Sequence, residues 1–190
     1  MIYLVRHGET LWNTLGRYQG IKDSPLTPQG VRQANTVATS LRREISESGQ
    51  SFELRVSPLG RTQETAALLQ SILPINKSDD ERLMEVSAGS WDGLTKFEIE
   101  NEFPGMLCGS TAYDWYFKSP DGESFDQACD RARAWLTNIH KPTIAVSHGL
   151  FGRILRGVYL GISKEEMLEL TVPQDGFFAL EKGEVRAVCC

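Results

Sequence analysis

The sequence predicts an α/β fold in which helices cover both faces of a largely parallel sheet. Two short apolar runs, at residues 2–5 and 143–147, have the length and β-branched composition of strands buried on both sides. A third strand-like run, ELRVSP, spans residues 53–58. Each run is followed by a longer segment in which apolar residues recur at helical spacing. Strands that alternate with helices in this way typically form a parallel sheet.

The first half of the chain contains two strand–helix units. After the strand at Ile2–Val5 and a loop, Thr27 is expected to cap a helix whose first residue is Pro28, where the missing N–H has no intrahelical partner to lose. The expected apolar stripe of this helix is Val31, Ala34, Ala38, Leu41 and Ile45. The strand at Glu53–Pro58 comes next, and RTQETAALLQSIL predicts a helix at residues 61–73.

A less regular, aromatic-rich stretch follows at about residues 91–122. Proline and glycine interrupt it, so we expect a lid-like insertion rather than a further strand–helix unit. Ser124 is then expected to cap a helix. The inner face of that helix is predicted to be Phe125, Ala128, Ala132, Trp135 and Ile139.

The last third of the chain predicts a strand at residues 143–147, a helix at residues 149–160 and a capping box at Ser163-x-x-Glu166. The sequence FFALEKGEVRAV then predicts a β-hairpin that turns at Lys182–Gly183. We find no linker, repeat or low-complexity segment. The sequence therefore predicts a single domain over residues 1–190.

Composition narrows the class of protein. The net charge of -5 argues against binding to nucleic acid or to an anionic membrane, because neither would attract an acidic protein. No segment reaches the ~20 apolar residues that a membrane-spanning helix needs. No secretory signal is recognised, so the four cysteines are expected to be free thiols in the cytoplasm. The negative net charge does not exclude an anionic substrate, because a local basic pocket can exist in an acidic protein.

Two His-Gly steps mark the ends of predicted strands. His7-Gly8 follows the first strand, His148-Gly149 follows the strand at residues 143–147, and Arg61 comes shortly after the strand at residues 53–58. Ligands of parallel α/β sheets bind at the carboxyl ends of the strands, so these groups are expected to meet there. Arginine side chains and glycine backbone amides can both donate hydrogen bonds to phosphate oxygens, so these residues indicate a phosphate site. The alternative is that each histidine only ends a strand and has no ligand.

An ordered set of motifs extends this pattern over almost the whole chain. LVRHGET is followed by Asn13 and Gln19-Gly20, and then by SPLGRTQETA, LMEVSAGSWDG, SPDGES and VSHG. This set resembles the histidine phosphatase superfamily, also called phosphoglycerate-mutase-like. The resemblance implies a three-layer αβα sandwich and a reaction that passes through a phosphohistidine.

The resemblance also implies the roles of nine residues. His7 would attack phosphorus, Arg6 and Arg61 would hold the phosphoryl oxygens, and His148 would donate a hydrogen bond to an oxygen that gathers charge in the transition state. Glu85 would protonate the leaving alcohol and then activate water, since its apolar sequence neighbours favour a protonated carboxyl. The implied substrate-binding residues are Asn13, Gln19, Gly20 and Gly149. This scheme needs neither a metal nor a cofactor.

The reaction itself leaves alternatives open. The superfamily contains phosphatases and phosphoglycerate mutases, and a mutase needs extra cations for a substrate carboxylate. Between residues 86 and 120 the only cations are Lys96 and Lys118, so the substrate end of the pocket is expected to be aromatic and weakly charged. This favours hydrolysis of a small phosphorylated metabolite, with a mutase as runner-up. A non-catalytic phosphoester-binding or partner-binding domain is a further alternative, and a homodimer is possible.

Overall fold

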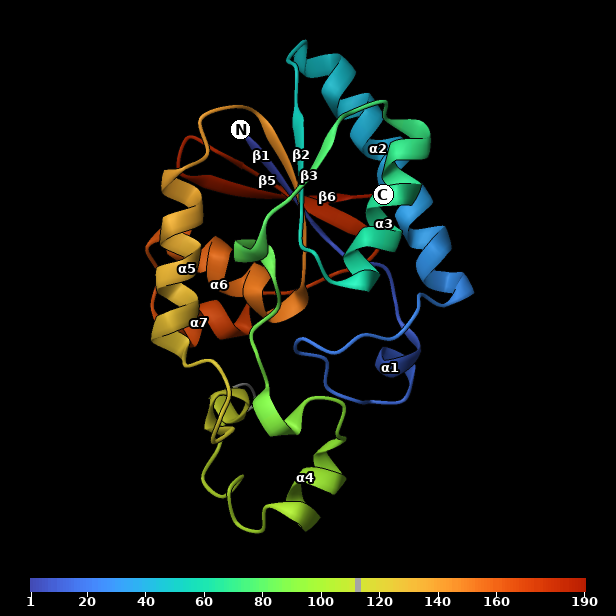
Figure 1. Ribbon diagram of the computed structural model, residues 1–190. Coiled ribbons are helices and arrows are strands. Elements are labelled where there is room, and N and C mark those ends of the chain that lie inside the picture. Colours follow the sequence, from blue (N-terminus) through green and yellow to red (C-terminus); the bar gives the residue numbers. More distant parts are fainter. Residues whose placement is uncertain (112–113) are drawn as a thin grey trace.

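A computed structural model of the protein describes residues 1–111 and 114–190 and shows a mixed sheet between two layers of helices (Figure 1). The order of the strands across the sheet is β3-β2-β4-β1-β5-β6. Their bounds are Ile2–Arg6 for β1, Glu53–Val56 for β2, Lys77–Asp79 for β3, Thr143–Ser147 for β4, Gly176–Glu181 for β5 and Glu184–Cys189 for β6. The αβα sandwich expected from the sequence is confirmed.

The sheet has a parallel half and an antiparallel edge. Strand β4 lies between β1 and β2 and is parallel to both, and β3 is parallel to β2. On the other side of β1, the β5–β6 hairpin adds two antiparallel strands. The hairpin turns at Lys182 and Gly183, both of which have positive φ, as the sequence predicted. The carboxyl ends of β1, β2 and β4 consequently lie at one edge of the sheet.

Seven α-helices are found among the described residues. Their bounds are Leu11–Thr14 for α1, Pro28–Ser48 for α2, Gly60–Ile72 for α3, Lys96–Glu102 for α4, Phe125–Thr137 for α5, Gly149–Leu160 for α6 and Lys164–Glu169 for α7. Figure 1 shows α2 and α3 on one face of the sheet and α5, α6 and α7 on the other. None of these helices is long and apolar enough to cross a membrane.

Alternation along β1 divides the apolar core into two parts. Tyr3 and Val5 point into the cluster beneath α2 and α3, whereas Ile2 and Leu4 point into the cluster beneath α5 and α6. Four of the five strand residues are buried, because both faces of the strand are covered. The central position of β1 therefore fixes the direction in which the chain leaves the sheet at Arg6.

Most helix starts agree with the expected caps. The side-chain oxygens of Thr27, Ser124 and Ser163 each accept a hydrogen bond from the backbone N–H three residues later. One stripe residue of α2 was predicted wrongly: Val31, in the first turn of the helix, is 37% exposed. The predicted strand at residues 53–58 ends at Val56, since Ser57 and Pro58 already belong to the turn before α3.

The segment at residues 91–122 leaves the sheet and carries α4, which projects away from the rest of the chain in Figure 1. Its residues 112–113 lie outside the described residues. Thr95 and Glu98 form a capping box at the start of α4. Arg17, on the loop after α1, holds the Glu98 carboxylate through two hydrogen bonds of 2.7 and 3.0 Å. The base of the expected lid is thus tied to the loop that follows β1; its function as a lid remains a prediction.

Two glycines allow the loop after β1 to lie directly against α2. A Cβ added to Gly30 would lie 2.2 Å from the carbonyl oxygen of Glu9, and one added to Gly8 would lie 2.4 Å from the carbonyl oxygen of Gly30. Neither backbone can give way without moving the other. The sequence places the two glycines far apart, so only the fold explains why both positions lack a side chain.

We expect Gly30→Ala to lower the free energy of unfolding by about 1–3 kcal/mol, the usual cost of overpacking a tight contact. Gly152→Ala is the matched control, because Gly152 also lies within a helix but its added Cβ would have 3.8 Å to the nearest atom. The free energy of unfolding of that control should rise by about 0.5–1 kcal/mol, because alanine has a higher helix propensity than glycine. Urea denaturation measures both values. Equal stabilities for Gly30→Ala and the wild type would contradict the close contact.

Candidate active site

The ends of β1 and β4 bring the two His-Gly steps together. Arg6 pairs with Ser147 in the parallel register, so His7 and His148 leave neighbouring strands at the same level. Their ring centroids are 5.3 Å apart, and the rings are tilted by 59°. Both side chains are buried, with 3% and 2% exposure. A single phosphoryl group can therefore lie within reach of both rings.

The surroundings of His7 fix both its charge and its tautomer. Burial, followed by the charges of Arg61 and Arg6, holds the pKa of His7 well below its ordinary value of 6.5. Nδ1 lies 2.8 Å from the carbonyl oxygen of Gly8, which can only accept a hydrogen bond, so Nδ1 carries the proton. The neutral ring consequently has its lone pair on Nε2. This is the form that a nucleophilic imidazole requires.

His148 has protein partners at both ring nitrogens. Arg61 Nε donates to Nδ1 at 3.2 Å, so the ring proton lies on Nε2, which donates to Ser57 Oγ at 2.8 Å. Burial and the charge of Arg61 hold the pKa of His148 well below 6.5. The sequence predicted that this N–H would reach a phosphoryl oxygen. In the structure it meets the Ser57 hydroxyl, with which a phosphoryl oxygen would have to compete.

Arg6 lies beside His7 at the end of β1, and only part of the hydrogen-bonding capacity of its guanidinium group is used. One terminal nitrogen donates to the carbonyl oxygen of Val172 at 2.6 Å. Its buried Nε–H has no acceptor among the described residues. Burial lowers the pKa of Arg6 to about 10, although the Glu85 carboxylate opposes the shift, so the side chain stays protonated at neutral pH. A charged donor in this state is suited to an anionic ligand.

Arg61 was also predicted to hold the phosphoryl group, but the structure gives it other partners. Its guanidinium donates to the backbone oxygens of Gly20 and Lys22 and pairs with the Asp23 carboxylate at 2.7 Å. Asp23 also accepts the backbone N–H groups of Gly60 and Arg61 at the start of α3. The anion expected near this helix start is therefore the side chain of Asp23. Arg61 does not line the pocket described below.

Glu85 is 7% exposed, and its carboxyl group lies against the first turn of α6. Its carboxyl group accepts three backbone N–H hydrogen bonds, from Leu150 at 3.1 Å, Phe151 at 2.7 Å and Val86 at 2.9 Å. These three donors come from two segments of the chain, the residue after Glu85 and the first turn of α6. They fix the orientation of the carboxyl group in the pocket.

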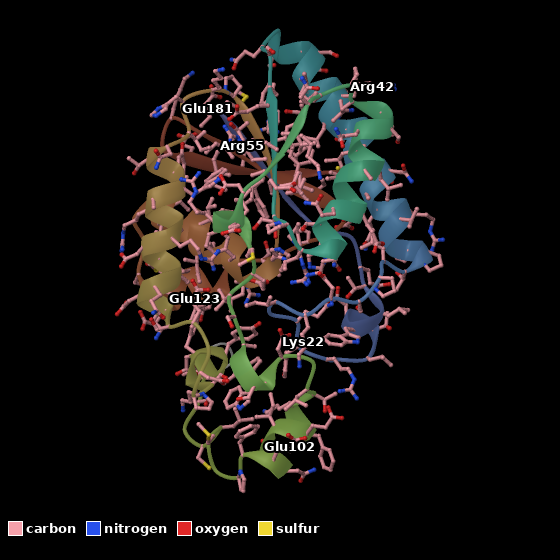
Figure 2. All side chains as sticks on the ribbon, viewed as in Figure 1. Lys22, Arg42, Arg55, Glu102, Glu123 and Glu181 are labelled. Carbon is pink, nitrogen blue, oxygen red and sulfur yellow. The ribbon has the colours of Figure 1, made fainter. Side chains whose placement is uncertain are left out.

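An ion pair outside the pocket holds the segment that carries Glu85. Arg131 on α5 pairs with Glu123 at 2.6 Å, and Figure 2 shows Glu123 at the end of α5 that faces the α4 segment. The same guanidinium donates to the carbonyl oxygens of Arg82 and Met84 and lies over the ring of Phe151 at 4.0 Å. Arg131 thus contacts both the backbone just before Glu85 and the ring of Phe151, whose N–H donates to the Glu85 carboxyl group.

The four predicted substrate-binding residues divide into two groups. Asn13, Gln19 and Gly149 line the pocket with Arg6, His7 and Glu85. Gly20 does not line the pocket. Its N–H donates instead to the buried Asp92 carboxylate at 2.8 Å. Asp92 also binds the N–H groups of Ile21 and Lys22, and Figure 2 shows Lys22 between the sheet and the α4 segment. Gly20 thus contributes to the shape of the loop.

The pocket has a volume of about 180 Å³ and contains residues that the sequence analysis did not identify. These further lining residues are Arg17, Tyr18, Leu150, Arg153 and Val172, and Tyr116 from the aromatic stretch lines the pocket as the sequence analysis allowed. Arg17 and Tyr18 lie between two predicted loop residues, and Arg153 lies four residues after Gly149 on one helix face, so the spacing could have identified them. The expectation of a weakly charged substrate end was wrong, since it counted only the cations of the expected lid.

The two buried histidines predict a pH-dependent stability. Both are neutral when folded and titrate near 6.5 when unfolded, so the unfolded state binds more protons below that pH. The free energy of unfolding should be independent of this effect above about pH 6.5 and fall as the pH drops below it. Urea denaturation from about pH 7.5 to about pH 5 should show a proton uptake on unfolding that His7→Gln reduces by up to about one. The exposed His140 is the control, and equal slopes for His7→Gln and His140→Gln would contradict the assignment.

Among residues 1–111 and 114–190, no three His, Cys, Asp or Glu side chains are grouped so that they could hold a metal ion. The groups that face the pocket are instead arginine, histidine, amide and carboxyl side chains. Such a set binds an anion by hydrogen bonds and positive charge. The geometry thus combines an anion site, a neutral imidazole and a buried carboxyl group.

The chain is similar to known proteins both in sequence and in structure. The sequence profile of the histidine phosphatase superfamily (branch 1) matches residues 2–186. The chain is 36% identical over 172 residues to the probable phosphoglycerate mutase GpmB of Yersinia pestis, which covers 85% of this chain and 75% of that protein. The structure of a putative α-ribazole-5'-P phosphatase from Escherichia coli aligns with a TM-score of 0.81 at 24% identity, covering 99% of this chain and 94% of that one. A mycobacterial glucosyl-3-phosphoglycerate phosphatase aligns with a TM-score of 0.78 at 24% identity, covering 93% and 87%.

The structural alignments at 24% identity establish the fold alone. The profile match and the Yersinia relative establish more, because they extend over most of the sequence. The profile match includes the strand ends at which His7 and His148 meet. The chain therefore belongs to branch 1 of the histidine phosphatase superfamily.

Proposed function

We propose that the protein hydrolyses a phosphomonoester of a small metabolite through a phosphohistidine on His7. The observation that carries this proposal is the state of the His7 ring. It is neutral, its Nδ1–H is held by Gly8, and its Nε2 lone pair is left for attack in a pocket that Arg6 also lines. A strand-end histidine with only a structural role would need neither the free Nε2 lone pair facing a pocket nor the two neighbouring arginines.

In the first step, Nε2 of His7 forms a bond to phosphorus while the bond from phosphorus to the ester oxygen breaks. Glu85, in its protonated form, transfers its proton to the departing oxygen, so the alcohol leaves neutral. In the second step, the Glu85 carboxylate takes a proton from water as the water oxygen attacks phosphorus. The P–N bond breaks, phosphate is released, and His7 returns to the neutral ring.

The positive charges of the site act mainly on the phosphoryl oxygens. Arg6 is pointed at the pocket by Val172 and has a buried Nε–H with donor capacity left. Donors that are already oriented stabilise the charge of the transition state without reorganising. Arg61 is held by Asp23 and the Gly20 loop, so it acts on the site through its charge, which also lowers the pKa of His7.

A phosphoglycerate mutase activity is the second candidate, and one observation favours it. Two more guanidinium groups line the pocket beyond Arg6, that of Arg153 and that of Arg17, which is paired with Glu98. Such groups could hold a substrate carboxylate while a phosphoryl group moves to a second hydroxyl. The Yersinia relative is described as a probable mutase, whereas the structural neighbours are described as phosphatases.

The deciding experiment is a phosphate-release assay with chelator present, using 3-phosphoglycerate, glycerol 3-phosphate and an aryl phosphate. The first two esters differ by a carboxylate, so their ranking reports on the arginines at the substrate end. The 3-phosphoglycerate sample is also assayed for its 2-isomer. Chelator-resistant release from any ester supports hydrolysis, and isomer formation without net release supports the mutase. Binding of the esters without either reaction would favour the non-catalytic alternative and contradict the proposal.

A further inference from the structure

We propose that Gln174 is a positioning residue that orients the side-chain amide of Asn13 toward the phosphoryl group. The proposal rests on the proposed function, because it concerns the same site. Gln174 lies between α7 and β5 and does not line the pocket. Its Nε2 donates to the carbonyl oxygen of His7 at 3.2 Å and to Oδ1 of Asn13 at 3.2 Å. One side chain from the far end of the sequence thus contacts both the backbone of the proposed nucleophile and its neighbour in the pocket.

The hydrogen bonds of Asn13 define which end of its amide faces the ligand. Oδ1 accepts the Thr10 N–H at 3.1 Å as well as the Gln174 amide, and an amide oxygen has two lone pairs. Both are therefore used. Nδ2 has one long contact, of 3.5 Å to Gln19 Oε1, so donor capacity remains for an anionic oxygen. A rotation of the amide by half a turn would place Nδ2 against two donors and Oδ1 toward the anion.

The orientation matters because a phosphoryl oxygen only accepts hydrogen bonds. With Oδ1 held by Thr10 and Gln174, the Asn13 amide presents donors to the pocket; when turned, it would present a partial negative charge. If the Thr10 N–H were the only partner of Oδ1, the Asn13 amide could still rotate about that single hydrogen bond. The second contact, from Gln174, comes from a different element and fixes the plane of the group.

Gln174 can act in this way because the segment before it is itself held in place. Three consecutive carbonyl oxygens of that segment each accept a hydrogen bond from a different arginine. The pairs are Arg153 Nε with Leu170 at 2.6 Å, Arg156 Nη2 with Thr171 at 2.5 Å, and Arg6 Nη1 with Val172 at 2.6 Å. Arg156 is 2% exposed and lies over the ring of Phe178 at 3.7 Å, so this attachment is buried. The segment consequently links Arg6 and Asn13.

The test compares Gln174→Ala, Asn13→Ala and the double variant for kcat/KM of phosphate release and for the Kd of inorganic phosphate. Gln174→Ala should lower kcat/KM and phosphate affinity by about 5–20-fold, as expected for the loss of an orienting hydrogen bond to an anion site. In the Asn13→Ala background the same change should cost at most about twofold, because the group that Gln174 orients is gone. A role in stability alone would reduce both backgrounds equally.

Gln174→Glu keeps the size of the side chain but places carboxylate oxygens against two acceptors, His7 O and Asn13 Oδ1. Gln174→Glu should therefore lower kcat/KM and phosphate affinity more than Gln174→Ala does. Gln70→Ala is the matched control, since Gln70 also donates its amide to a backbone carbonyl, that of Ile75, near the end of α3 away from the pocket. This control should keep the kinetic constants of the wild type. Thermal denaturation of all variants checks that each is folded.

Two outcomes would overturn the inference. In the first outcome the two residues act independently, so that the fold-losses of kcat/KM and phosphate affinity in Gln174→Ala and Asn13→Ala multiply in the double variant. The other is a Gln174→Glu protein with the phosphate affinity of the wild type. Calorimetry with inorganic phosphate needs no turnover, so coupling between the two residues is measured even if no ester is hydrolysed. In that case the proposed function fails while the positioning role of Gln174 stands.

Discussion

The substitution His7→Ala is expected to lower phosphate release by at least about 10⁴-fold, in the range found when the nucleophile of a covalent enzyme is removed. Without the imidazole no P–N bond can form, and the remaining groups can only bind the ester and stabilise charge. Arg6 and the backbone amides stay in place, so KM should change much less than kcat. The measurement is steady-state phosphate release with the best ester of the panel.

The covalent intermediate gives an independent measurement of the same prediction. A phosphohistidine survives alkaline quenching and hydrolyses in acid, so wild-type protein quenched in base should retain label from a phosphorylated substrate. His7→Ala should retain none. His140→Ala is the control, because His140 is the only other histidine besides His148 and is exposed. Turnover by His7→Ala within tenfold of the wild type would remove His7 as the nucleophile.

The second large effect is expected for Glu85→Gln and depends on the leaving group. With an alkyl ester, kcat should fall by about 10²–10⁴-fold, because the departing alkoxide no longer receives a proton. With a nitrophenyl ester the leaving group needs no proton, so His7 should still be phosphorylated. Hydrolysis of the phosphohistidine then lacks its base. Stopped-flow absorbance should therefore show a rapid release of about one nitrophenol per protein, followed by a slow phase.

The structure also predicts a side effect of Glu85→Gln on stability. The amide oxygen can keep the contacts of Oε1 with Val86 and Phe151, but the NH₂ group would face the N–H of Leu150. We expect a loss of about 1–3 kcal/mol, the usual cost of a buried donor left without an acceptor. Glu53→Gln is the matched control, since Glu53 is a partly buried carboxylate that pairs with Arg55 on β2. If Glu85→Gln slowed the rapid release of nitrophenol as much as it slows release of an alkyl alcohol, Glu85 would be excluded as the acid.

The elements that could be predicted from the sequence are those whose cause is local. Thr27 and Pro28 start α2 where their own chemistry requires it, and Ser163 caps α7 through a residue three positions away. By contrast, β3 has the polar sequence KSD and is exposed along its length, so no apolar pattern reveals it. It becomes a strand only because the edge of β2 is available for pairing.

The candidate site was predicted in outline because motifs at strand ends converge in any parallel sheet. What could not be predicted are the partners that those residues take. Asp23 neutralises Arg61, Asp92 occupies the Gly20 amide, and Gln174 binds Asn13, each across more than thirty positions of sequence. Short motifs carry no information about such contacts. They depend on the strand order and on how each loop folds over the sheet.

The position of β1 in the sheet determines when the site can assemble. Ile2 pairs with Thr143 on one side and with Leu180 on the other, so the first strand to be synthesised has no partner until most of the chain exists. Pairings so distant in sequence raise the contact order and slow folding. At about 5–20 residues per second, the ribosome would hold β1 unpaired for several seconds. A nascent chain should therefore gain the joined His7 and His148 loops only late, which makes phosphate binding a sensitive reporter of complete folding.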